Sequence, residues 1–212
     1  VIGGDKGAYY TPASLDGSRP GAFYANTTGG RWNYNTYSLT YHEAVPGHHT
    51  QIALMQEMDL PLFRQIINFD AYAEGWALYA ENLADELGWY DDYLYGKLGM
   101  LEFQALRAAR LVVDTGIHAK GWTYDEGVAF LMENAMIPQG FAEYEAARYT
   151  VYPAQATSYM VGLLKILDLR QQVMDAQGDA FDIKEFHNVV LENGALPLDL
   201  LEALIVEHYG LE

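Results

Sequence analysis

Residues 41–51 read Tyr41-His42-Glu43-Ala44-Val45-Pro46-Gly47-His48-His49-Thr50-Gln51. A His-Glu pair followed within two helical turns by another His is typical of zinc hydrolases. Two imidazoles hold the ion, and the Glu acts on a metal-bound water. The usual spacing places the second His four residues after the first, but Pro46 stands there. The next histidines are His48 and His49, six and seven residues after His42.

The Pro-Gly pair explains how this longer spacing can still form a metal site. Each helical residue turns the chain by about 100°, so an unbroken helix would place His48 roughly 120° from the face of His42. Proline removes an amide donor and glycine permits unusual backbone angles, so the pair can bulge the helix and return His48 to the metal. His49 is nearly in phase with His42 but lies about 10 Å along the axis. We therefore predict His42 and His48 as ligands, His49 as the alternative, and Glu43 as the general base.

Composition limits the classes of protein to which the chain can belong. Its 212 residues, half of them hydrophobic, suffice for one substantial domain. A net charge of −17 argues against a nucleic-acid partner, because phosphate binding needs clustered Lys and Arg. The absence of cysteine excludes disulfides and leaves His and carboxylates as metal ligands. No apolar run approaches the ~20 residues that span a bilayer. These features leave the compartment open between the bacterial periplasm or cell envelope and the cytoplasm.

The pattern along the chain predicts a mainly α-helical domain with a small N-terminal β element. Residues 1–37 are rich in turn-forming residues, and 21–27 form either a short strand, whose edge could pair with a peptide, or a surface loop. Helical periodicity begins near residue 38. The helices expected from periodicity, capping boxes, Gly and Pro cover about 38–58, 62–87, 91–113, 123–137, 141–150, 154–176, 182–194 and 197–210.

A third metal ligand is expected from the second helix. Asp70, Glu74 and Glu81 are spaced so that they share one helical face. Gly75 weakens the helix, and a close approach to another helix would explain its presence. A carboxylate beside such a crossing is well placed to ligate, so we predict Glu74 as the third ligand. Glu81 or Asp70 would orient a ligating imidazole from behind it. The alternative is a solvated acidic face.

Four stretches in the same order resemble a known family. They are His42-Glu43-x-x-Pro46-Gly47-His48-x-x-Gln51, Glu74-Gly75-Trp76-Ala77-Leu78-Tyr79-x-Glu81, Asp114-Thr115-Gly116-Ile117-His118 with Gly121-Trp122, and Tyr152-Pro153-x-Gln155-Ala156 with Tyr159. Together they resemble the bacterial predicted metallopeptidases grouped as domain-of-unknown-function family 885. Members of that family are usually much longer, so the chain of residues 1–212 resembles only their C-terminal, metal-bearing part.

The resemblance implies a zincin-like, gluzincin fold akin to thimet oligopeptidase and angiotensin-converting enzyme. In that group the third zinc ligand is a Glu some two dozen residues past the second His, and Glu74 lies 26 residues past His48. The group also places a Tyr, and often a His, near the substrate carbonyl. By this resemblance Tyr159 or Tyr152, and His118, would stabilise the oxyanion. The alternatives are a tyrosine stripe used for packing and a histidine that favours a helix C-terminus.

We therefore predict a zinc-dependent hydrolase, most simply a metallopeptidase acting on a peptide or other small amide. His42, His48 and Glu74 would hold Zn²⁺, and Glu43 would take a proton from the metal-activated water. One alternative is a metal-dependent amidase or esterase with a non-peptide substrate. Another is a non-catalytic helical binding module with a structural or vestigial metal site. The chain is also expected to need either an N-terminal half or a second copy if its cleft is incomplete.

Overall fold

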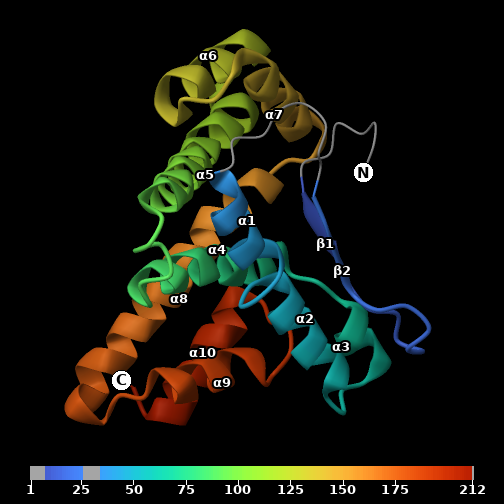
Figure 1. Ribbon diagram of the computed structural model, residues 1–212, viewed down its shortest axis with the longest axis vertical. Coiled ribbons are helices and arrows are strands. Elements are labelled where there is room, and N and C mark those ends of the chain that lie inside the picture. Colours follow the sequence, from blue (N-terminus) through green and yellow to red (C-terminus); the bar gives the residue numbers. More distant parts are fainter. Residues whose placement is uncertain (1–7, 26–33, 212) are drawn as a thin grey trace.

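The computed structural model describes residues 8–25 and 34–211 and is mainly helical, with one small sheet (Figure 1). The strands are β1 (Tyr9–Thr11) and β2 (Ala22–Tyr24). The helices are α1 (Asn35–Glu43), α2 (His48–Glu57), α3 (Leu62–Ile66), α4 (Asp70–Glu86), α5 (Leu94–Lys120), α6 (Tyr124–Ala135), α7 (Gln139–Val151), α8 (Gln155–Gln177), the 3₁₀ turn η1 (Gly178–Ala180), α9 (Ile183–Leu191) and α10 (Leu198–Tyr209). None of the helices within these ranges is both long and apolar enough to cross a bilayer.

The β element is a two-stranded antiparallel sheet. Tyr10 faces Phe23 across the pair. The strand expected at 21–27 is confirmed over 22–24, and residues 26 and 27 lie outside the described ranges. Its partner β1 was not predicted, because three residues among turn formers carry no usable periodicity.

The predicted interruption of the first helix is present, and it separates α1 from α2. A Cβ on Gly47 would collide with the backbone carbonyl oxygens of Tyr41 and His42, so only glycine lets the chain turn back this closely over the end of α1. The indole N–H of Trp76 donates to the Pro46 carbonyl oxygen at 2.9 Å and ties the turn to α4. The turn therefore fixes where α2 begins.

Two predicted helix boundaries are wrong. The segment 62–87 is not one helix, because Ile67 and Phe69 are extended and separate α3 from α4. The helix expected over about 91–113, with its end near Gly116, continues to Lys120. Gly116 lies within it because the Trp122 ring packs where a Cβ would stand, and the helix stops at Gly121, whose φ is +73°. Gly116 therefore serves packing, whereas Gly121 serves termination.

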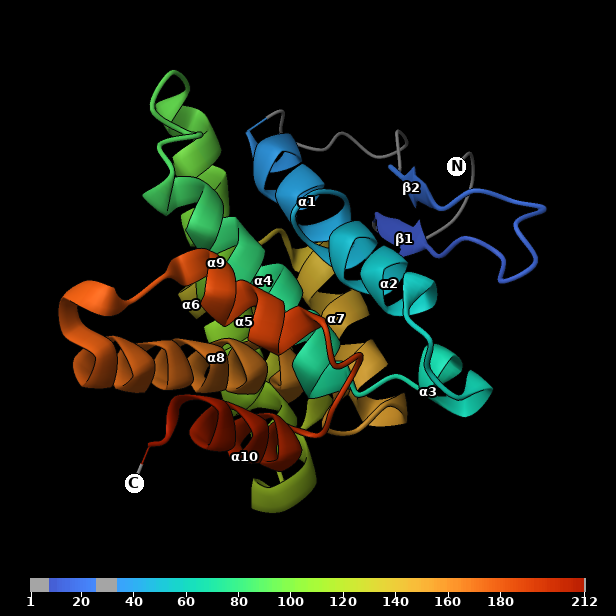
Figure 2. The ribbon, with the colours of Figure 1, turned by 90° about the horizontal axis from the view of Figure 1, so that it is seen from below.

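The centre of the fold is the crossing of α4 and α8, which lie against each other in both views (Figures 1 and 2). A Cβ on Gly75 would stand 2.5 Å from the Gly162 Cα, and a Cβ on Gly162 would collide with the Ala71 carbonyl oxygen. The two glycines thus let the backbones touch, and the predicted close approach at Gly75 is confirmed.

Two buried apolar clusters lie on either side of this crossing. One joins α4 and α8 to α9 and α10 and includes Trp76, Ile166 and Phe186. The other joins α5, α6 and α7 and includes Leu106 and Leu131. Figure 1 shows α6 and α7 at one end of the molecule and α9 and α10 at the other. The helices α1, α2 and α4 lie between these ends and carry the site described next.

Candidate metal centre

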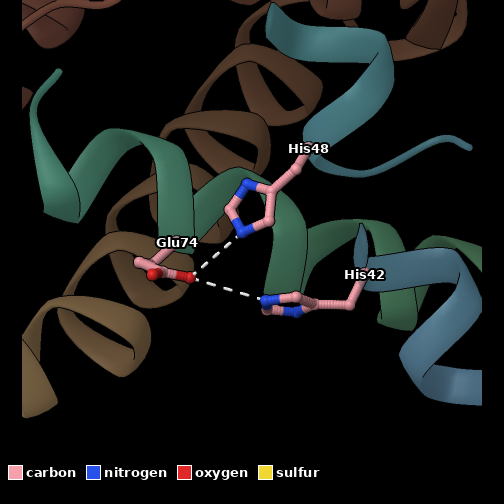
Figure 3. Close-up of side chains that lie close together, drawn as sticks. All are labelled: His42, His48 and Glu74. Carbon is pink, nitrogen blue, oxygen red and sulfur yellow. Dashed lines mark ion pairs between the residues drawn. The ribbon is translucent and has the colours of Figure 1, made fainter. Parts of the chain in front are cut away.

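Three side chains from three helices converge on one point (Figure 3). His42 lies in the last turn of α1, His48 begins α2, and Glu74 lies in the second turn of α4. Glu74 Oε2 is 3.5 Å from His42 Nε2 and 3.3 Å from His48 Nε2. One ligand atom from each residue can be chosen so that all three lie within 4.8 Å of one another. No other group of three His, Asp or Glu in the described ranges meets this condition.

The turn at residues 44–47 is what brings the two imidazoles together. The rings of His42 and His48 are perpendicular, with centroids 4.8 Å apart. Since a continuous helix would separate six-residue neighbours by roughly 120°, the break at residues 44–47 produces the encounter. His49 points elsewhere, and its Nδ1 lies 2.8 Å from the Tyr10 hydroxyl. Of the two histidines left open by the sequence, the structure places His48 at the cluster.

Glu81 fixes the orientation of the His42 ring. Glu81 is fully buried, and its Oε1 is 2.8 Å from His42 Nδ1, while its other oxygen accepts from the Ser38 hydroxyl. A carboxylate accepts only, so His42 Nδ1 carries a proton and the ring turns Nε2 toward the cluster. Glu81 therefore occupies the orienting position expected of it.

The His42 imidazole and the Glu74 carboxylate shift each other's pKa. Burial alone would lower the pKa of His42, but the nearby carboxylates of Glu74 and Glu81 outweigh burial and raise it to about 9. Burial would raise the pKa of Glu74, yet His42 and His48 hold it well below its usual range. The positive charge that this raised pKa favours on His42 thus lies against the carboxylates, and a divalent cation would supply positive charge at the same place.

The residues present fit a metal ion. Glu74 Oε2 is buried and makes no hydrogen bond within the described part of the chain, although it faces both Nε2 atoms. An unsatisfied buried carboxylate oxygen is costly unless a cation or donor meets it. Two imidazoles and one carboxylate are a known ligand set of catalytic zinc, which leaves a fourth position open.

Glu43 lies beside the cluster in a cleft of about 610 Å³. Its side chain is buried, and burial raises the pKa of its carboxyl, while His42 and His48 oppose the rise. The backbone of Tyr10 on β1 also acts to lower the pKa of this carboxyl. The group that would act as base therefore stands next to the proposed ligands with limited solvent.

Beyond the cluster the cleft is bounded by β1 and the residues after it, by α2, and by residues 65–68. Its apolar side chains include Leu15, Ile52, Met55, Ile66 and Ile67. Among the described lining residues, His42, Glu43, His48 and Glu74 are the ones with an imidazole or carboxylate side chain. The rest of this cleft thus offers apolar and neutral polar surface.

Tyr159 is the predicted tyrosine that the structure places at the cleft. Its ring is stacked on His42 with centroids 6.2 Å apart and an interplanar angle of 16°. The guanidinium of Arg110 lies 4.7 Å from its ring centre. Burial, followed by the charge of Glu74, raises the pKa of the phenol to about 12. The hydroxyl therefore stays protonated and is a hydrogen-bond donor at neutral pH.

Three other predicted site residues lie elsewhere. His118 Nε2 is 2.9 Å from the Tyr149 carbonyl oxygen, so the imidazole is used between α5 and α7. The Tyr152 side chain is 53% exposed, and its hydroxyl donates to Asp70 at 3.3 Å. Asp70 also accepts from Asn68, so it does not orient a ligating imidazole. The structure does not bring His118, Tyr152 and Asp70 to the cluster, because spacing along one helix does not reveal which neighbour faces each side chain.

Two contributors to the surroundings were not singled out from the sequence. The Tyr10 hydroxyl is hydrogen-bonded to His49, and the Tyr10 backbone acts to lower the pKa of Glu43. Glu145 is a buried acid on α7 that binds two arginines. No sequence signal identified Tyr10, whereas Glu145 and Arg148 have the spacing of a helical ion pair.

Comparison with known proteins places these residues in a family. The sequence profile of the family described as "Bacterial protein of unknown function (DUF885)" matches residues 2–205. A putative lipoprotein from Colwellia psychrerythraea is 43% identical, with a TM-score of 0.95 over 98% of this chain and 36% of that protein. A putative lipoprotein of unknown function from Shewanella oneidensis is 26% identical, with a TM-score of 0.83 over 93% of this chain and 38% of that protein. The chain thus spans little more than a third of these relatives. No curated protein matches it.

Proposed function

The chain belongs to the DUF885 family of bacterial proteins, and we propose that it is the zinc-binding part of a hydrolase, with a peptide as substrate. One observation carries this proposal: two imidazole nitrogens and a carboxylate oxygen converge beside a buried Glu in an open cleft. The zincin-like fold belongs to the same proposal. A binding module with a structural site would not need Glu43 next to the ligands.

Each residue has a distinct role in this proposal. His42, His48 and Glu74 would hold Zn²⁺, which when bound supplies a Lewis acid and lowers the pKa of water. The Glu43 carboxylate accepts a proton from the attacking water and later delivers it to the leaving amine. The Tyr159 hydroxyl, protonated at neutral pH, donates a hydrogen bond to the oxygen that gains charge.

Two features of the cleft favour a peptide over a small charged molecule. The strand β1 lines the cleft, and β2 is its one strand neighbour within the described residues. Extended peptides commonly bind beside such a strand through the backbone. The apolar residues of α2 and α3 suit uncharged side chains of such a peptide. The relatives' description as putative lipoproteins would place the activity in the cell envelope.

Metal content tests the proposal before any substrate is known. The purified chain should contain close to one zinc per chain by elemental analysis, or take it up from micromolar zinc. A folded chain that binds no zinc under either condition would overturn the proposal.

A substitution at the base tests the chemistry. Glu43→Gln should retain zinc and lower hydrolysis of an apolar peptide library by about 10²–10⁴-fold, the usual contribution of a general base. Glu57→Gln, at an exposed site on α2, is the matched control and should match the unsubstituted chain. Equal activity of Glu43→Gln and Glu57→Gln would exclude Glu43 as the base. A parallel screen of esters and non-peptide amides separates a peptidase from an amidase or esterase.

A further inference from the structure

A series of hydrogen bonds, buried at Glu145 and partly buried beyond it, runs from α7 to the candidate metal ligand Glu74. Glu145 on α7 is 3% exposed and accepts from Arg110 and Tyr149, each at 2.7 Å. It also accepts from Arg148 Nη2 at 3.2 Å. Burial would raise the pKa of Glu145, but the two arginines lower it to about 2. This carboxylate is therefore a fixed anchor for Arg148 at neutral pH.

Arg148 in turn fixes the amide of Gln155. Arg148 Nη1 donates to Gln155 Oε1 at 2.7 Å. A guanidinium can only donate, so the amide atom that faces it must be the oxygen. The amide NH₂ therefore points the other way. The contact with Arg148 thus determines which way the Gln155 side-chain amide points.

The Gln155 NH₂ faces both Glu74 and Tyr159. Gln155 Nε2 is 3.4 Å from Glu74 Oε1 and 3.3 Å from the Tyr159 hydroxyl oxygen. Since the NH₂ only donates, it occupies Glu74 Oε1 and leaves Oε2 facing His42 and His48. The same NH₂ makes the Tyr159 oxygen an acceptor, so the phenolic proton remains for another partner.

We infer that Gln155 is a positioning residue that holds Glu74 and Tyr159 in register with the metal, and that Arg148 and Glu145 hold Gln155. This inference rests on the proposed function, because it assigns what Gln155 does for that site. It also gives α7, which lies outside the cleft, a role in metal binding. Groups that orient metal ligands typically contribute 10–100-fold in metal affinity.

Zinc affinity is the test, measured by competition with a chromogenic chelator on the folded apo chain. Gln155→Glu keeps the acceptor for Arg148 but replaces the NH₂ with a second carboxylate facing Glu74. Gln155→Leu removes both contacts without adding charge. We expect about 10–100-fold weaker zinc binding for Gln155→Glu and at least about 10-fold for Gln155→Leu. The Co²⁺ absorption spectrum should also change, since it reports ligand geometry.

Gln171→Leu is the matched control, because Gln171 lies on the same helix and bonds only the exposed Asp175. Its zinc affinity should equal that of the unsubstituted chain. Arg148→Met should weaken zinc binding, and Arg148→Lys, which keeps a donor, should restore part of the loss. Circular dichroism of the apo forms establishes that each variant is folded. If one of the two Gln155 variants or one of the two Arg148 variants fails to fold, the other variant at that position is used.

The outcomes separate this inference from the proposed function. If the unsubstituted chain binds zinc and folded Gln155→Glu and Gln155→Leu bind it within about 2-fold with an unchanged Co²⁺ spectrum, the positioning role is refuted and the hydrolase proposal stands. If the unsubstituted chain binds no zinc, both are refuted. Weakened binding in the Gln155 variants together with a normal Gln171→Leu supports the inference.

Discussion

The crossing of α4 and α8 provides a sharp prediction, because it links backbone packing to the position of Glu74. Gly162→Ala adds one methyl group at a point where the neighbours are the Ala71 carbonyl oxygen and the Gly75 Cα. Backbone atoms cannot rotate aside as a flexible side chain can, so the helices must separate. Because Glu74 is adjacent to Gly75, it would move away from Gln155 on α8.

The magnitude follows from two opposing effects. Overpacking costs about 1–3 kcal/mol, and this contact belongs at the upper end because it is with backbone. Replacing Gly with Ala inside a helix contributes about 1 kcal/mol of stability. The free energy of unfolding should therefore fall by about 2 kcal/mol. For a domain of this size the melting temperature should drop by about 4–8 °C.

Thermal and denaturant unfolding of the apo chain would measure this change, with Gly140→Ala as the control. Gly140 lies in α7, and a Cβ there would meet nothing within 4 Å, so Gly140→Ala should raise stability by up to about 1 kcal/mol. Gly162→Ala should also bind zinc more weakly than Gly140→Ala. If the two variants were equally stable, the close approach of α4 and α8 would not be what requires glycine.

Two further predictions concern histidines. His48→Ala should lower zinc affinity by at least about 10²-fold, whereas His49→Ala should leave it nearly unchanged; the reverse order would exchange their roles. Burial, reinforced by the charge of Arg170, lowers the pKa of His187 to about 4 in the folded chain. Below pH 6.5 the unfolded chain therefore binds a proton at this residue, whereas the folded chain does not. Stability should therefore fall between pH 6.5 and 4 by roughly 1–2 kcal/mol after allowance for partial exposure, and His187→Gln should flatten this part of the profile. An unchanged profile for His187→Gln would contradict the assignment.

The sequence by itself determined most of the helices and singled out the three residues that converge in the candidate site. Periodicity, the Thr123–Glu126 capping box and the glycines after helices are local signals, and the structure follows them closely in α6 to α10. The sequence also singled out His42-Glu43, the Pro-Gly turn and Glu74-Gly75. Candidate ligand types and a helix interruption can be recognised from a few neighbouring residues. The close helix approach at Gly75 followed from the cost of glycine in a helix.

Only the tertiary structure decided which side chains share the cleft. His48 and His49 are consecutive residues of α2, and the break before this helix places it so that His48 faces Glu74 and His49 faces Tyr10. The spacing of His118 and Tyr152 did not predict which side chains or helices they would contact. Both make their hydrogen bonds away from the cluster.

The series of hydrogen bonds from Glu145 to Glu74 shows why the sequence alone did not predict these contacts. It joins α7, α8 and α4 through residues as far as 81 positions apart. Helix propensity and capping act over a few residues. They determine where each helix begins and ends along the sequence, but not how the helices cross. Which faces meet is set by the contact of Gly75 with Gly162 and by the burial of apolar surface on both sides of it. Those contacts exist only once the chain has packed.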